Sequence, residues 1–107
     1  IGYEAVAMAD PKLLEIAMTN LFENAVKFKT SGKAECVFEE GALAVKNYGD
    51  ALEEPIDKYF EPFFKETSIR NEHGMGLGLY LSKKALEIQG LKLIYKRKEG
   101  QNIFFVR

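Results

Sequence analysis

The sequence predicts an α/β fold of the α+β two-layer sandwich type, in which helices cover one face of a β-sheet. Two long segments have apolar residues at helical spacing, and short segments rich in β-branched and aromatic residues occur in pairs. The length of 107 residues suits one domain, which we expect to span residues 1–107. With 47% hydrophobic and 29% charged residues, the composition is that of a globular protein rather than a disordered chain.

Charge and cysteine content exclude several classes of function. Fifteen basic residues against sixteen acidic ones leave a formal charge of −1, so the chain has no electrostatic footprint for nucleic acid. Cys36 is the only cysteine, which excludes an internal disulfide, and we expect it to be a small buried side chain in a strand. Because the chain begins with Ile1 rather than Met, we expect a fragment of a longer protein.

The first helix is predicted to begin at Pro11 and to run to about residues 27–29. Asp10 supplies a side-chain acceptor at the N-cap, and proline suits the first helical position. The second helix is predicted over residues 77–89, ending at Gly90. The apolar stripe of the first helix consists of Leu14, Ala17, Met18, Leu21, Ala25 and Phe28.

Five short segments are predicted to be strands, and Glu40-Gly41 is expected to close a hairpin. Residues 48–75 are irregular apart from a helical turn near residues 56–59, and long irregular segments are often functional lids. The predicted strands cover residues 2–8 (the weakest), 34–39, 43–47, 91–96 and 102–106. We expect the basic residues Lys92, Lys96, Arg97 and Lys98 to form a solvated strand edge.

Polar residues on the first helix point to phosphate chemistry. Asn20, Glu23, Asn24 and Lys27 are spaced by three and four residues, so they share a face, which we expect opposite the apolar stripe. Amide oxygen is a hard ligand that suits magnesium, and lysine neutralises phosphate charge. The alternative is a solvated face with a modest Glu23–Lys27 ion pair, and the helix taken alone favours that alternative.

A glycine-rich segment leads directly into the second predicted helix. Alternating glycines allow backbone N–H groups to approach an anion at a helix N-terminus. The segment is not a Walker A motif, because no Lys-Ser/Thr follows, and it is not a Rossmann fingerprint, because no strand precedes it. Its residues are Gly74, Met75, Gly76, Leu77, Gly78 and Leu79.

Two further segments admit two interpretations each. Residues 59–65 carry three phenylalanines, which either pack on the core or meet a partner surface. Lys65 and Arg70 follow, and both are able to reach a phosphate. Asn47-Tyr48-Gly49-Asp50 is either a turn or the source of a hydrogen bond to a base edge.

In this order, the segments resemble the ATP-binding catalytic domain of sensor histidine kinases, which has the Bergerat ATPase fold. Residues 20–28 are similar to the N box of that family, 47–51 to the G1 box, 60–65 to the F box and 74–79 to the G2 box. The resemblance covers nearly the whole chain from Asp10. It implies a mixed five-stranded sheet covered on one face by helices, a flexible ATP lid, and the absence of the leading helix of the family.

The resemblance also implies roles for individual residues. Asn24 is expected to be the magnesium ligand, Asn20 to lie beside the phosphates and Lys27 to contact them. Asn47 is expected to face the amino group of adenine, and Gly49 to let the base approach. The other nucleotide-binding positions are Phe60, which anchors the lid of residues 59–74, the basic Lys65 and Arg70, and Gly74, Met75, Gly76, Leu77, Gly78 and Leu79.

The implied function is transfer of the γ-phosphate of Mg-ATP to a histidine on a separate dimerisation and phosphoacceptor domain, with a response regulator downstream. ATP and Mg²⁺ are the implied cofactors. The fragment is expected to be monomeric, because dimerisation in the family usually belongs to the domain that is missing here. It is expected not to autophosphorylate alone, because the phosphoacceptor histidine domain is missing and His73, the only histidine, lies in the predicted lid. We expect no contact with nucleic acid or membrane, and a cytoplasmic location in a parent anchored in the inner (plasma) membrane of a bacterium.

Departures from the family pattern keep other functions open. The G1 box of the family usually reads Asp-x-Gly-x-Gly, whereas this chain has Asn47 and Ala51 at the first and last positions. A neutral amide accepts hydrogen bonds less strongly than a carboxylate, which motivates the alternative of a degenerate nucleotide-binding regulatory module without kinase activity. Another Bergerat-type ATPase or serine kinase is a further alternative. Gyrase-type ATPases carry a glutamate base where this chain has Asn20, which disfavours hydrolysis.

Overall fold

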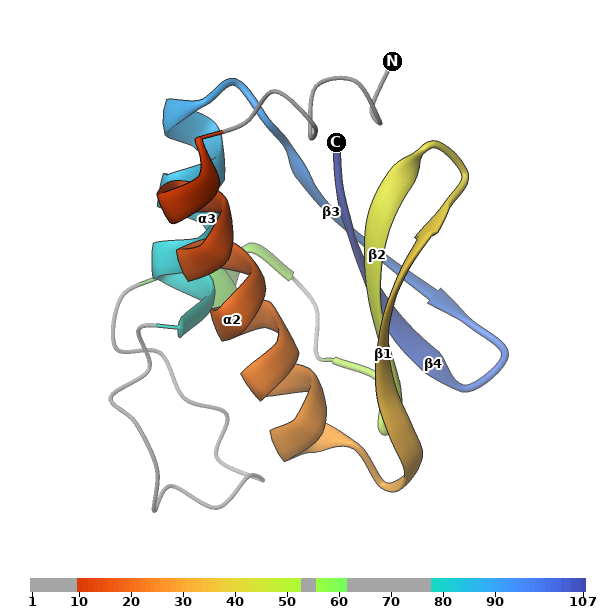
Figure 1. The fold of residues 1–107 in the computed structure, drawn as a ribbon. Coiled ribbons are helices and arrows are strands. Elements are labelled where there is room, and N and C mark those ends of the chain that lie inside the picture. Colours follow the sequence, from red (N-terminus) through yellow and green to blue (C-terminus); the bar gives the residue numbers. More distant parts are fainter. Residues whose placement is uncertain (1–9, 53–55, 62–77) are drawn as a thin grey trace.

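The computed structural model describes residues 10–52, 56–61 and 78–107. In this part of the chain, helices lie on one face of a four-stranded sheet, as the predicted two-layer architecture requires (Figure 1). None of the helices described is long and apolar enough to cross a membrane. The elements in chain order are α2 (Pro11–Phe28), β1 (Ser31–Glu39), β2 (Ala42–Tyr48), the 3-10 helix η1 (Ile56–Phe60), α3 (Gly78–Ile88), β3 (Leu93–Lys98) and β4 (Gln101–Val106).

The sheet is built from two hairpins, with the strand order β1-β2-β4-β3 and antiparallel pairing throughout. Each hairpin closes with a Glu-Gly pair in which both residues have positive φ: 55° and 75° at Glu40 and Gly41, and 51° and 81° at Glu99 and Gly100. Positive φ at both central residues is the signature of the type I′ turn, whose twist matches that of the flanking strands. The predicted hairpin at Glu40-Gly41 is confirmed.

The prediction of a mixed, five-stranded sheet is wrong for the described residues, which form four strands. All three pairings are antiparallel because two-residue turns can join only antiparallel neighbours, and β2 and β4 also run in opposite directions. The fifth predicted strand, residues 2–8, lies outside the described residues. β1 begins three residues earlier than expected, since its pairing with β2 extends to Ser31↔Tyr48 beyond an irregularity before Glu35.

Both predicted helices are present, and local signals define their ends. The Asp10 carboxylate accepts hydrogen bonds from the backbone N–H groups of Lys12 (2.9 Å) and Leu13 (3.1 Å), which confirms the predicted N-cap. At the end of α3, Gly90 has a φ of +77°, and the Leu91 N–H donates to the Leu86 carbonyl at 2.9 Å. This pattern, with Gly90 N–H donating to Glu87, is a Schellman cap, which requires the left-handed conformation that glycine adopts most easily.

The helices α2 and α3 pack side by side in opposite directions (Figure 1). At one end, the backbone N–H of Asp10 donates to the side-chain oxygen of Gln89 at 2.6 Å. Midway, the Ser82 hydroxyl donates to the Ala17 carbonyl at 3.0 Å, and neither residue has any exposed surface. Two small residues at the contact therefore allow the helices to approach closely, and the hydroxyl joins them.

Substitution of Ser82 by Ala tests this helix contact. We expect the free energy of unfolding to fall by about 1 kcal/mol, because the variant loses one buried hydrogen bond while the Ala17 carbonyl keeps its partner within α2. Chemical denaturation measures the change, with Ser31→Ala at the exposed start of β1 as the control. Equal stability of the two variants would show that the hydroxyl contributes nothing to helix pairing.

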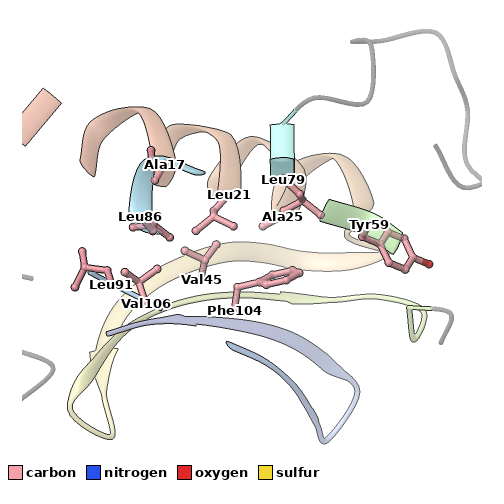
Figure 2. Packing of buried hydrophobic residues seen from close by; sticks show 11 residues of the cluster. Ala17, Leu21, Ala25, Val45, Tyr59, Leu79, Leu86, Leu91, Phe104 and Val106 are labelled. Atoms are coloured by element: carbon pink, nitrogen blue, oxygen red, sulfur yellow. The ribbon is translucent and has the colours of Figure 1, made fainter. Parts of the chain in front are cut away.

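The main core lies between the helices and the sheet (Figure 2). Leu21 of α2 and Leu86 of α3 are almost completely buried, as are Val45 of β2 and Val106 of β4, which come from the opposing sheet. A second cluster on the other face of the sheet contains Ala42, Ala44, Ile103 and Phe105, with Ile94 packed against it. The central strands β2 and β4 are therefore buried on both faces.

The prediction that Cys36 is buried is wrong, because its side chain is exposed. Cys36 lies in β1, at one end of the strand order, where the side chains are mostly exposed. The sequence pattern of a strand does not distinguish a terminal strand from a central one. Partial burial still raises the pKa of the Cys36 thiol, so it stays protonated at neutral pH and is a weak nucleophile.

Candidate functional site

A small cavity lies where the end of α2 and the start of α3 meet the sheet. Its volume is about 20 Å³, which is room for about one water molecule. Figure 2 shows Ala25, Leu79, Tyr59 and Phe104 at this end of the core. Apolar side chains form most of the wall, and three amides supply its polar groups. The lining residues are Asn24, Ala25, Phe28, Asn47, Leu52, Tyr59, Leu79, Asn102 and Phe104.

Two of the amides lie opposite each other on adjacent central strands. Asn47 of β2 pairs with Asn102 of β4, and both are almost completely buried. The Asn102 oxygen accepts hydrogen bonds from the Tyr95 hydroxyl at 2.5 Å and from Arg97 Nη1 at 3.1 Å, while its amide nitrogen donates to the Asp50 carbonyl at 2.9 Å. These partners fix the orientation of Asn102. If its oxygen and nitrogen changed places, the amide N–H groups would face the Arg97 donor and the amide oxygen would face the Asp50 carbonyl oxygen.

Asn47 differs from Asn102 in having an unsatisfied donor. Its amide nitrogen is buried and has no hydrogen-bond partner among the residues that the structure describes. A buried donor without an acceptor costs about 1–3 kcal/mol. Because the same residue lines the cavity, a ligand that brings an acceptor would relieve this cost.

Gly49 is packed tightly behind Asn47. A Cβ atom at this position would lie 2.8 Å from the Phe28 carbonyl oxygen and 2.9 Å from the Asn47 amide nitrogen. The Gly49 carbonyl accepts a hydrogen bond from Arg97 Nη1 at 2.6 Å, and its N–H donates to the Gly100 carbonyl at 3.2 Å. These contacts give Gly49 a packing role, and its predicted role in approach of the base stays a prediction.

Asn24 lies on the flank of the apolar stripe, so the prediction that it is opposite the stripe is wrong. Each residue of an α-helix turns the side-chain direction by about 100°, which places Asn24 only about 60° from the buried Leu21. Asn24 is half-buried and lines the cavity. Its amide nitrogen lies 3.2 Å from where a Cβ of Gly78 would be, at the first residue of α3. Asn24 of the predicted N box and Gly78 of the predicted G2 box therefore lie side by side.

The Asn24 amide near the start of α3 suits a magnesium ion that is already bound to the phosphates of a ligand. Among the described residues, no group of three or more His, Cys, Asp or Glu side chains could hold a metal ion. Asn24 offers one amide oxygen, which is a hard donor. Magnesium keeps several waters and commonly takes one or two protein ligands plus phosphate oxygens, so one amide suits an ion already bound to phosphate.

The other predicted residues on α2, η1 and α3 have the following positions. Asn20 is half-buried one turn before Asn24, and Lys27 is exposed, with its ammonium 5.7 Å from the centre of the Phe28 ring. Phe60 packs edge-on against Phe104 with ring centres 6.2 Å apart, and Leu79 is buried in the cavity wall. The remaining predicted positions, Lys65, Arg70, Gly74, Met75, Gly76 and Leu77, lie outside the described residues, as does His73.

Arg97 and Asn102 were missed as site residues. The prediction placed Arg97 in a solvated strand edge, and β3 is indeed at the end of the strand order, but its guanidinium also holds the Gly49 carbonyl and the Asn102 amide. Arg97 pairs with Asn102, which pairs with Asn47, so the three form one row across three strands. The Glu99-Gly100 turn was the available signal, because a two-residue hairpin there pairs Arg97 with Asn102.

Substitution of Arg97 by Ala tests whether this row supports the cavity. We expect the affinity for a ligand of this cavity to fall several-fold, because Gly49 and Asn102 each lose a charge-assisted hydrogen bond. Lys98→Ala removes the same charge from the next residue of β3 and is the matched control for long-range electrostatics. Equal losses in the two variants would mean that the Arg97 charge acts at a distance and not through these bonds.

Comparison with known proteins decides the family. The profile described as "Histidine kinase-, DNA gyrase B-, and HSP90-like ATPase" matches residues 9–106. The chain belongs to this ATPase family. Within the family, the sensor histidine kinase ArsS of Helicobacter pylori is 37% identical over 98 residues, which are 92% of this chain and 23% of that protein. The circadian input-output histidine kinase CikA of Synechococcus elongatus is 35% identical over 94% of this chain and 14% of that protein.

Solved structures of ATPase-family domains agree with the fold. The nucleotide-free catalytic domain of histidine kinase ThkA has a TM-score of 0.75 at 28% identity, over 92% of this chain and 67% of that chain. The mycobacterial sensor histidine kinase MprB has a TM-score of 0.67 at 23% identity, over 92% of this chain and 73% of that chain, which supports the fold alone. The resemblance to histidine kinase catalytic domains is confirmed. The chain spans about a quarter or less of the two curated relatives named above.

Proposed function

We propose that this domain binds Mg-ATP and donates the γ-phosphate to a histidine on a separate domain of a two-component sensor kinase. One observation carries the proposal. Residues from the segments similar to the N, G1 and G2 boxes, Asn24, Asn47 and Leu79, line one cavity, and the buried Asn47 amide nitrogen has no hydrogen-bond partner among the described residues. A nucleotide would satisfy this amide and bring phosphates toward the start of α3.

The base end of the nucleotide is proposed to enter the apolar part of the cavity. Phe28, Leu52, Tyr59 and Phe104 offer the apolar surface that an aromatic ring requires. The cavity of about 20 Å³ is too small for a purine, since a single water already needs about 10–15 Å³ on the same scale. Binding of the base therefore requires side chains of the wall to move apart, whether before or after the nucleotide arrives.

The phosphate end is proposed to lie at the start of α3. This end of a helix carries unpaired backbone N–H groups and a partial positive charge, and α3 is an 11-residue helix beginning at Gly78. The Asn24 amide lies beside Gly78, and we propose that its oxygen would hold a magnesium ion bound to the phosphates. Asn20 and Lys27, on the same side of α2, are proposed to lie beside the phosphates, and Lys27 supplies a positive charge.

The acceptor histidine is the proposed nucleophile. The lone pair of its ring nitrogen forms a bond to the γ-phosphorus as the bond to the β,γ-bridging oxygen breaks, and ADP leaves. The proton of the other ring nitrogen passes to a base of the acceptor domain. This chain contributes by positioning the nucleotide and neutralising its charge, which are the main sources of catalysis in phosphoryl transfer.

The wider setting is proposed from the relatives, which are named as sensor histidine kinases and are much longer than this chain. We propose that the parent carries a dimerisation and phosphoacceptor domain, acts on a response regulator and is anchored in the plasma membrane of a bacterium. The domain alone is proposed to be monomeric and unable to autophosphorylate, with its phosphoacceptor supplied by the rest of the parent.

Calorimetric titration of ATP and ADP into the domain, with and without magnesium, tests the nucleotide site. We expect micromolar binding of ATP that weakens when magnesium is removed. A folded sample that binds neither nucleotide at millimolar concentration would contradict the proposal and favour a degenerate regulatory module. Labelled ATP and the parent's histidine domain then test transfer, and binding without appearance of an acid-labile phosphohistidine would refute the kinase function alone.

A further inference from the structure

The Asn47 side-chain amide is able to adopt two orientations, whereas the neighbouring Asn102 amide is held in one. Three hydrogen bonds hold the Asn102 oxygen and nitrogen in fixed places. The Asn47 nitrogen has no partner within the described residues, so no bond to it opposes a half-turn of the amide. Such a turn exchanges a donor and an acceptor with almost no change of shape.

The edges of purine bases differ in the same two groups. Adenine presents an amino donor at position 6, whereas guanine presents an oxygen acceptor there. At the neighbouring ring nitrogen the order is reversed, because N1 of adenine accepts a hydrogen bond and N1–H of guanine or hypoxanthine donates one. A primary amide in one orientation matches adenine at both atoms, and the same amide after a half-turn matches a 6-oxopurine at both atoms.

A carboxylate at the same place has no such freedom. Both of its oxygens only accept, so it pairs with the 6-amino group of adenine and repels a 6-oxo group. Asn47 lacks this repulsion, and repulsive contacts are a common source of specificity between similar ligands. Among the described residues that line the cavity, none carries a carboxylate that would reject a 6-oxopurine.

We propose that the cavity accepts 6-oxopurine nucleotides such as ITP and GTP alongside ATP, with little discrimination between them. This inference rests on the proposed nucleotide site and names its ligand class. It follows from the buried Asn47 amide nitrogen, which has no partner in the described part of the chain, from the place of Asn47 in the cavity wall and from the fixed orientation of Asn102 beside it.

Competition binding with a fluorescent ATP analogue tests the inference on the unmodified domain. ITP is the decisive competitor, because hypoxanthine differs from adenine only at position 6 and at the proton of N1, whereas GTP adds a 2-amino group. We expect ITP to bind within about tenfold of ATP, the factor that corresponds to one hydrogen bond of average strength. ITP binding more than about 100-fold weaker than ATP would overturn the inference and leave the ATP site intact.

The variant Asn47→Asp should restore discrimination. We expect it to strengthen ATP binding and weaken ITP binding, so that the ratio of their dissociation constants changes by about tenfold or more. Asn47→Ala is the control, because it removes donor and acceptor together and should weaken ATP and ITP alike. An unchanged ratio in a folded Asn47→Asp variant would place Asn47 away from position 6. Absence of binding by any nucleotide to the unmodified domain would instead refute the proposed function itself.

Discussion

Replacing Asn24 by Ala is expected to abolish the magnesium dependence of ATP binding. Asn24 lines the cavity, its amide lies beside Gly78 at the start of α3, and it is the proposed ligand of an ion on the phosphates. Residues that only support metal ligands already change affinity by about 10- to 100-fold, so loss of the ligand itself should cost at least that much. The affinity measured with magnesium should therefore fall to the value measured with a chelator.

Two variants make this result specific to the amide oxygen. Asn24→Asp keeps an oxygen ligand of nearly the same shape and should keep the magnesium dependence. Thr19→Ala, at an exposed position on α2, should leave ATP binding unchanged. An Asn24→Ala domain that stays folded and still binds ATP more tightly with magnesium would show that the ion is held elsewhere.

Replacing Gly49 by Ala is expected to damage both the fold and the cavity. The added methyl group would lie 2.8 Å from the Phe28 carbonyl, a backbone atom at the end of α2 that cannot move independently of the helix. Forcing such a shift typically costs about 1–3 kcal/mol of stability. Since Phe28 and Asn47 both line the cavity, we expect a large loss of ATP affinity in the same variant.

Gly41→Ala is the control for Gly49→Ala. It shows the general effect of replacing a glycine, without a contact such as that between a Gly49 methyl group and the Phe28 carbonyl. Gly41 has a φ of +75°, and nothing lies within 4 Å of where its Cβ would be. Its replacement should cost about 1–2 kcal/mol through backbone conformation and should not change ATP affinity once the sample is folded. Denaturation and calorimetry measure the two effects separately. Equal ATP affinity of the two variants would show that the space beside Gly49 is unimportant for the ligand.

The parts of the fold that could be predicted are those with local signals. Asp10 and Pro11 mark the start of α2, and Glu40-Gly41 marks a hairpin, because capping and positive φ depend on a few adjacent residues. The number of strands was predicted less well, since the pairing of segments far apart in the chain depends on the assembled sheet. Cys36 illustrates the same limit, because its exposure follows from the terminal position of β1 in the described sheet.

The site could be predicted to a similar extent. Asn24 and Asn47 were found because each lies in a motif, and the structure places both at one cavity. Tyr95, Arg97 and Asn102 were not found, because their contribution depends on register across three strands, of which the Glu99-Gly100 turn indicates only the pairing of β3 with β4. The orientation of Asn24 was predicted incorrectly. Spacings of three and four residues show that side chains share a face of the helix, but they do not show the angle between that face and the buried face.

The antiparallel packing of α2 on α3 has a consequence for the entropy of binding. Ser82 and Ala17 hold the two helices in close contact, so the position of Asn24 relative to Gly78 is established when the chain folds. The contact between Asn24 and Gly78 needs no ligand to form, whereas the apolar cavity is too small for a purine as it stands. If a nucleotide binds as proposed, its phosphates would meet a contact between Asn24 and Gly78 that already exists, and more of the conformational freedom lost on binding would come from side chains around the base.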